Sequence, residues 1–161
     1  MSNVFLLLGS NEGDRHRWIQ SALEELQSSV GNITAQSPLY QTAAWGVEDQ
    51  PDFLNMAVAM TTRLSPTQLL ENTQAIEQHL GRQRTEKWGQ RTLDIDILFY
   101  DSDIIRLPQL VIPHPYVQER RFALAPLEQV APHFVHPVLK KTIKQLLLEC
   151  PDPLPVTVVS G

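Results

Sequence analysis

The sequence contains, between residues 91 and 98, the alternating stretch Arg91-Thr92-Leu93-Asp94-Ile95-Asp96-Ile97-Leu98. Leu93, Ile95 and Ile97 share one parity, and this period of two, with its β-branched residues, predicts a strand. Side chains two positions apart on a strand project from the same face, with Cα atoms roughly 6.5–7 Å apart. Asp94 and Asp96 therefore direct two carboxylates into one space, flanked by apolar residues.

Two carboxylates held this close repel each other, and partial burial increases the cost. A shared proton, nearby cations or a bound metal relieves the repulsion. Carboxylate oxygens suit Mg²⁺, which binds proteins through one or two carboxylates together with substrate phosphates. For an isolated Asp-x-Asp, two acids on a solvated strand face are the commoner explanation, so the neighbouring residues decide the interpretation.

The segment directly before this strand is basic. Four of the 13 Lys and Arg residues lie in the run Gly81-Arg82-Gln83-Arg84-Thr85-Glu86-Lys87-Trp88-Gly89-Gln90-Arg91, although the whole chain has a net charge of −5. Such a run alone is typical of a solvated loop. Guanidinium groups also bind phosphate oxygens through paired hydrogen bonds. Because this run leads into the carboxylate pair, the two together suit a metal-bound polyphosphate.

Length and composition indicate an ordinary globular protein. With 161 residues, we expect a single domain over 1–161, with 151–161 as a proline-rich, extended tail. The single cysteine, Cys150, excludes an internal disulfide and fits a reducing compartment. The sequence shows no secretory signal, and the early apolar run Val4–Leu8 is too short to span a membrane. The negative charge disfavours nucleic acid as a partner. We therefore expect a cytoplasmic protein that acts as a monomer on small molecules.

The remaining patterns predict helices and strands in a mixed order. Asp14 and Ser65 are good N-caps, and Pro66 suits the first position of a helix. We expect strands or extended segments over 4–8, 32–44, 53–64, 92–98, 104–105 and 110–112, and helices over 14–31, 65–81, 122–130 and 140–148. This order predicts an α+β fold, compatible with a ferredoxin-like antiparallel sheet with helices packed on it.

Four segments together resemble one enzyme family. They are Leu8-Gly9-Ser10-Asn11, Gln50-Pro51-Asp52-Phe53-Leu54-Asn55, the run Arg82-x-Arg84…Trp88-Gly89-x-Arg91-Thr92-Leu93-Asp94-Ile95-Asp96-Ile97, and Pro113-His114…Arg120-x-Phe122. In this order they are similar to the signature of 6-hydroxymethyl-7,8-dihydropterin pyrophosphokinase, an enzyme of folate biosynthesis. The matches extend from residue 4 to about residue 135. The resemblance implies a ferredoxin-like fold and transfer of the diphosphate of ATP to the 6-hydroxymethyl group of the reduced pterin, with release of AMP.

The resemblance also implies roles for individual residues. Two Mg²⁺ ions would bind to Asp94 and Asp96, which with three arginines form the catalytic set Arg82, Arg84, Arg91, Asp94 and Asp96. ATP would contact Gln74, Glu77, Arg82, Arg84, Trp88, Arg91, His114 and Arg120. The pterin would contact Thr42, Phe53, Asn55 and Phe122, with the two aromatic rings stacking on it. The segment 83–90 would close over ATP as a lid. Thr85 and Pro115 depart from the family pattern, which commonly has Lys and Tyr at these positions.

Two other functions remain open from the residues alone. A different metal-dependent enzyme, such as a nucleotidyl transferase, would use the Asp-x-Asp strand but leaves Phe53, Asn55 and Phe122 without a role. A ligand-binding or regulatory domain of ferredoxin-like shape would explain the fold. It leaves unexplained why acids and arginines converge on one strand.

Overall fold

The computed structural model describes residues 1–11, 13–42, 52–82 and 93–159, with the side chains of residues 81 and 82 left out. Within these ranges, six strands form an antiparallel sheet in the order β5-β1-β4-β3-β8, with β2 also pairing with β4. The strands are β1 (Ser2–Ser10), β2 (Gly31–Gln36), β3 (Tyr40–Thr42), β4 (Phe53–Thr62), β5 (Asp94–Tyr100) and β8 (Val156–Val158). Strand β1 therefore lies between the strand that carries the aspartates and the strand that carries Phe53 and Asn55.

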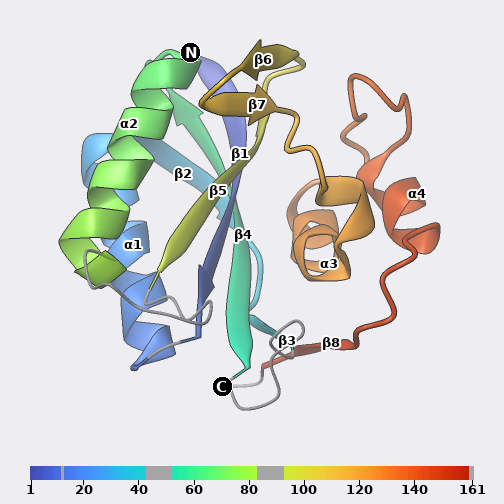
Figure 1. The fold of residues 1–161 in the computed structure, drawn as a ribbon, viewed down its shortest axis with the longest axis horizontal. Helices are drawn as coiled ribbons and strands as arrows, with labels where there is room; N and C mark the ends of the chain where they lie inside the picture. Colours follow the sequence, from blue (N-terminus) through green and yellow to red (C-terminus); the bar gives the residue numbers. More distant parts are fainter. Residues whose placement is uncertain (12, 43–51, 83–92, 160–161) are drawn as a thin grey trace.

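Helices cover both faces of this sheet (Figure 1). Helices α1 (Arg15–Ser29) and α2 (Pro66–Glu77) pack on one face, while α3 (Arg121–Val130) and α4 (Ile143–Leu148) lie on the other. The predicted caps are present, since Asp14 accepts a hydrogen bond from the Arg17 amide and Ser65 forms a capping box with Gln68. The predicted α+β fold with an antiparallel sheet is thus confirmed.

The alternation of side chains along the strands divides the core in two. Val4, Leu6 and Leu8 of β1 point toward α1 and α2, whereas Leu7 points toward α3 and α4. Strand β5 follows the same rule, because Ile95 and Ile97 belong to the first core. Asp94 and Asp96, which alternate with these two residues, consequently lie on the face of the sheet that α3 covers.

Several smaller elements complete the described ranges. Strands β6 (Ile105–Leu107) and β7 (Leu110–Ile112) form a separate hairpin, followed by the 3-10 helix η2 (Val117–Glu119). After α2 the helical backbone continues as a π-helix, η1 (Gln78–Arg82). The helix predicted over 65–81 therefore consists of two parts and ends at Arg82, one residue later than predicted. No helix within the described ranges has the length and apolar character needed to cross a membrane.

Candidate active site

Strand register brings together residues that are far apart in the sequence. Gly9 on β1 is paired with Asn55 on β4 and with Asp94 on β5. Two residues earlier, Leu7 is paired with Ala57 and Asp96. The central strand therefore carries small or apolar residues, and the polar side chains of its two neighbours flank it.

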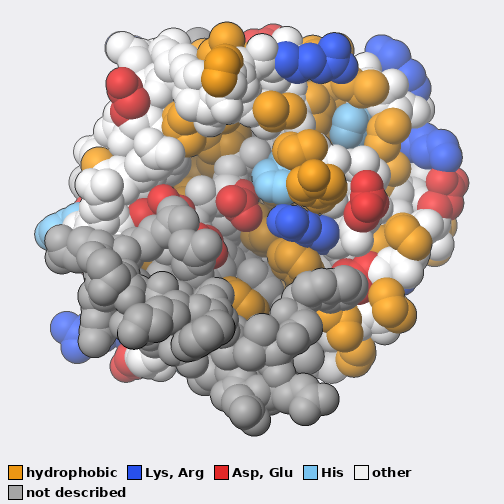
Figure 2. Space-filling model, in the orientation of Figure 1, with side chains coloured by type: hydrophobic (Ala, Val, Ile, Leu, Met, Phe, Trp, Pro, Cys, Tyr) orange, Lys and Arg blue, Asp and Glu red, His pale blue; other side chains and the backbone are white. Residues whose placement is uncertain are grey.

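A pocket of about 600 Å³, open to solvent, lies over this part of the sheet. Its lining comes from the strands, the start of α3 and the C-terminal segment: Leu7, Gly9, Thr42, Phe53, Asn55, Asp94, Asp96, Arg120, Phe122 and Leu154. All four predicted pterin-binding residues and both predicted metal ligands are among them. On the face drawn in Figure 2, acidic, histidine and basic side chains gather around a hollow.

Among the described residues that line this pocket, Asn55 has a buried polar atom without a hydrogen-bond partner. Its side chain is buried, with 3% of the residue exposed, and its Nδ2 has no hydrogen-bond partner within the described ranges. A buried amide without a partner is costly, so its presence calls for an explanation such as a ligand. The amide offers a donor and an acceptor side by side, which complements an aminopyrimidinone edge.

Gly9 makes room for that amide. A Cβ atom at residue 9 would lie only 2.9 Å from Asn55 Oδ1. Any side chain at this position would therefore push the amide out of place. Gly9 is the last but one residue of β1, and it forms part of the pocket lining.

The opening of the pocket is aromatic and cationic. Phe53 begins β4 and Phe122 lies in the first turn of α3, and both rings line the pocket. Arg120 directly precedes α3, with its guanidinium carbon 5.3 Å from the Tyr116 ring centroid and 5.7 Å from that of Phe122. These cation–π contacts hold a positive charge beside the aromatic wall.

A second pocket, of about 650 Å³, shares Asp96 with the first. It lies between β5 and the β6–β7 hairpin and is lined by Leu70, Ile95, Asp96, Ile97, Pro108, Gln109, Leu110, Val111, His114 and Pro115. Most of these side chains are apolar, while Asp96, Gln109 and His114 supply polar groups. The predicted phosphate contact His114 and the predicted metal ligand Asp96 therefore line one cavity.

His114 is held as a neutral ring. Its amide donates to the Leu98 carbonyl at 3.0 Å, and its Nδ1 accepts from the Tyr116 amide at 3.2 Å. Burial, with the nearby Arg120 charge as a second cause, lowers the pKa of His114 from 6.5 to about 4. Because Nδ1 accepts, the single ring proton is on Nε2. At neutral pH, His114 thus offers a hydrogen-bond donor without a positive charge.

This protonation state can be measured by nuclear magnetic resonance titration of the imidazole C–H signals. We expect the free protein to show a His114 pKa of about 4, and added ATP to raise it, because phosphate charge favours the imidazolium form. Since the folded pKa lies below the unfolded value, His114 should lower stability as the pH falls from about 6.5 to 4. His114→Gln should lose less stability than the wild type over this range. A free-protein pKa near 6.5 would contradict the assignment.

Glu77 and Gln74, both predicted to contact ATP, have different environments on α2. Glu77 is 4% exposed, and its Oε2 accepts a hydrogen bond from the Ile95 amide at 2.7 Å. Its carboxylate thereby ties α2 to the start of β5, between Asp94 and Asp96. Gln74 is exposed and lines neither of the two pockets. Contact of either residue with ATP stays a prediction, but Glu77 also has a positioning role that the sequence did not indicate.

Asp94 and Asp96 are the candidate metal ligands among the described residues of the first pocket. Within the described ranges, no group of three or more His, Cys, Asp or Glu side chains is arranged to hold a metal. A pair of carboxylates beside a large open cavity nevertheless fits Mg²⁺, which keeps water molecules and uses substrate phosphates as its other ligands. The donor set is thus compatible with a metal that arrives with a nucleotide.

The basic segment cannot be placed in this site. Arg84, Trp88 and Arg91, together with the lid predicted over 83–90, lie outside the described residues, and so does the side chain of Arg82. Their predicted roles stay predictions. Conversely, sequence reasoning missed Leu154 and the hairpin residues Pro108 to Val111, which line the pockets without any motif.

Comparison with known proteins agrees with this geometry. Residues 5–132 match the family model for 7,8-dihydro-6-hydroxymethylpterin-pyrophosphokinase (HPPK). A protein of Aquifex aeolicus named 2-amino-4-hydroxy-6-hydroxymethyldihydropteridine pyrophosphokinase is 40% identical over 145 residues, covering 90% of this chain and 90% of its own. A protein of Bacillus subtilis with the same name is 46% identical over 132 residues, covering 81% of this chain and 79% of its own.

Solved structures show the same fold. A crystal structure of a Plasmodium falciparum HPPK-DHPS triple mutant superposes with a TM-score of 0.77 at 19% identity, and that of the wild type with pteroate superposes with a TM-score of 0.78 at 18% identity. Each covers 92% of this chain, which spans only 43% and 44% of those longer chains. The fold, the matched family model and the identity to the bacterial enzymes agree: the chain belongs to the 7,8-dihydro-6-hydroxymethylpterin-pyrophosphokinase family.

Proposed function

We propose that this protein transfers the diphosphate of ATP to the 6-hydroxymethyl group of 6-hydroxymethyl-7,8-dihydropterin, where its two pockets meet at Asp96. The reaction gives AMP and the pterin diphosphate, a step of folate biosynthesis. The observation that carries the assignment of the site is that Asp96 lines both cavities. Two substrates bound side by side would then present their reacting ends to the same carboxylate, and catalysis by proximity requires this arrangement.

The first pocket suits the pterin. The Asn55 amide would bind the polar edge of the ring, since its buried Nδ2 has no other partner within the described ranges. Phe53 and Phe122 would contact the ring from β4 and α3, and the apolar side chains of Leu7 and Leu154 exclude water. Held in this way, the ring would direct its hydroxymethyl group toward the aspartates.

The second pocket suits the nucleotide. Its apolar lining offers a surface for the base, and His114 would donate its Nε2 proton to a phosphate oxygen. Arg120 lines the first pocket near the aspartates and would offset phosphate charge. Arg82, Arg84, Arg91 and Trp88 are assigned to the phosphates by the resemblance alone, as are Gln74 and Glu77 to the nucleotide.

Asp94 and Asp96 would hold two Mg²⁺ ions. When bound, such ions neutralise phosphate charge and polarise the phosphoryl group that is transferred. The protein's own part is to place the two carboxylates on one face of β5. The Glu77 hydrogen bond to the Ile95 amide between them fixes the strand at this point.

The function is tested by incubating the protein with Mg-ATP and 6-hydroxymethyl-7,8-dihydropterin. We expect AMP and a diphosphorylated pterin in equal amounts, and loss of both products when EDTA removes the magnesium. Formation of ADP and a monophosphorylated pterin would contradict diphosphate transfer. Pterin binding without turnover would favour a ligand-binding domain.

Phe122→Ala should weaken pterin binding much more than ATP binding. Phe122 lines the first pocket and not the second, and a lost stacking partner costs on the order of 0.5–1.5 kcal/mol beyond its buried area. Calorimetry with each ligand separately measures the two affinities. Equal weakening of both would mean that the ring only packs against its neighbours.

We further propose that the protein acts as a monomer in the cytoplasm, on small molecules and not on nucleic acid. The single cysteine fits a reducing compartment, and the net charge of −5 disfavours nucleic acid as a partner. Sedimentation of the purified protein at several concentrations tests the oligomeric state.

A further inference from the structure

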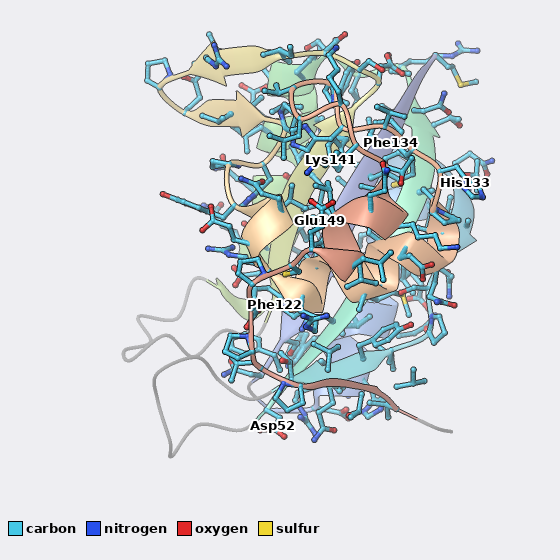
Figure 3. The ribbon with its side chains drawn as sticks, turned by 90° about the vertical axis from the view of Figure 1, so that its right-hand side faces the viewer. Asp52, Phe122, His133, Phe134, Lys141 and Glu149 are labelled. Carbon is cyan, nitrogen blue, oxygen red and sulfur yellow. The ribbon has the colours of Figure 1, made fainter. Side chains whose placement is uncertain are left out.

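The segment after α4 crosses the molecule from one side of the pterin pocket to the other. It leaves α4, passes the start of α3 near Phe122 and then forms β8 (Figures 1 and 3). Strand β8 pairs with β3, where Val156 lies opposite Thr42 and Val158 opposite Tyr40. We call residues 150–158 the strap.

Asp152 fixes the strap to the start of α3. This carboxylate is 6% exposed, and its Oδ2 accepts a hydrogen bond from the Arg121 amide at 3.1 Å. Its other oxygen accepts from the Leu154 amide at 3.0 Å. The Arg121 amide is one of the first amides of α3, which have no partner within the helix, and a negative charge at a helix N-terminus is favourable.

Arg121 adds two further bonds to the strap. Its Nε donates to the Asp152 carbonyl at 3.1 Å, and its guanidinium donates to the Cys150 carbonyl at 3.1 Å. Its two chain neighbours, Arg120 and Phe122, both line the pterin pocket. The strap therefore holds Arg121, which does not line the pocket, and by doing so it constrains the neighbouring Phe122, which does.

The other end of the strap is fixed to the opposite wall. The Thr42 hydroxyl donates to the Pro155 carbonyl at 3.3 Å, and Leu154, between the two anchors, lines the pocket itself. Arg120 and Phe122 form one wall and Thr42 belongs to the other. A single strap thus connects both walls and contributes an apolar side chain between them.

We infer that this strap sets the width of the pterin pocket, and that Asp152 is a positioning residue for Phe122. Without its carboxylate, the Arg121 and Leu154 amides lose their shared acceptor and the first turn of α3 is free to shift. Ring stacking depends on the placement of Phe122, so the affinity for the pterin should fall. The affinity for ATP, which is assigned to the second pocket, should stay unchanged. The inference rests on the proposed function only for the identity of the ligand.

The test compares Asp152→Ala, Asp152→Asn and the control Glu149→Ala, which removes a nearby carboxylate that is paired with Lys141 away from the pocket. Asp152→Ala should raise the KM for the pterin about tenfold while the KM for ATP changes less than about twofold. The reason is that a small displacement of Phe122 moves the bound pterin out of its productive position. The KM of Asp152→Asn for the pterin should lie between those of Asp152→Ala and the wild type, because the Asn side chain keeps only one acceptor oxygen. Glu149→Ala should match the wild type in both constants.

Hydrogen exchange of the Arg121 and Leu154 amides provides a measurement that needs no activity. Both amides should exchange faster in Asp152→Ala than in the wild type, while amides of α1 stay unchanged. Equal increases in both KM values, or unchanged exchange at Arg121, would overturn the inference. If the wild-type protein does not convert the pterin, the proposed function fails, and the exchange experiment still decides whether the strap holds α3.

Discussion

Asp96→Asn is expected to lower turnover by about 1,000-fold or more while the protein remains folded. Asp96 lines both pockets, and the carboxylate pair supplies the protein ligands for magnesium in the proposed mechanism. Metal ions contribute several kcal/mol of charge stabilisation, and each 1.36 kcal/mol corresponds to about a tenfold change in rate. Asparagine keeps the size of the side chain, so the fall in turnover measures the contribution of the negative charge. Single-turnover assays at increasing Mg²⁺ concentration measure it.

A matched control separates this effect from a general loss of acidic charge. Asp103→Asn changes an exposed aspartate in the turn after β5 and should leave turnover and magnesium dependence unchanged. Asp94→Asn should behave like Asp96→Asn, because both side chains lie on the same face of β5. Near wild-type turnover in a folded Asp96→Asn protein would contradict the metal assignment, whatever the pterin affinity.

Asn55→Leu is expected to weaken pterin binding roughly 30- to 100-fold without lowering the stability of the free protein. A hydrogen bond contributes about 0.5–1.5 kcal/mol, and the amide has a donor and an acceptor to offer, so two such bonds account for a loss of this order. In the free protein, however, Asn55 Nδ2 has no partner within the described ranges. Replacing a costly unsatisfied group with an apolar one of similar size should therefore be neutral or stabilising.

Weaker pterin binding together with unchanged or higher stability distinguishes a binding residue from a packing residue. Met56→Leu, on the other face of β4, is the control and should change neither pterin affinity nor ATP affinity. Calorimetry gives the affinities and thermal unfolding the stability. If Asn55→Leu destabilises the protein and leaves pterin binding intact, Asn55 is part of the core and not of the site.

Local sequence patterns determined the secondary structure and the type of chemistry. The alternation at residues 92–98 placed Asp94 and Asp96 on one face of a strand because side-chain direction on a strand depends only on parity. Asp14 and Ser65 marked helix starts because capping depends on neighbouring backbone amides. Residue type and spacing indicated the Asp-x-Asp pair as a possible metal site, whereas the roles of Phe53, Asn55 and Phe122 came from the resemblance to the family.

Only the tertiary structure decided how these parts meet. The central position of β1 places Asn55 and Asp94 on either side of Gly9, and no sequence pattern specifies which strands become neighbours. Likewise, the low pKa of His114 arises mainly from burial, and Glu77 fixes β5 through a bond to a main-chain amide 18 residues away. The strap was predicted only as an extended tail, because the pairing of β8 with β3 and the contact between Asp152 and α3 depend on long-range packing, which short-range periodicity does not encode.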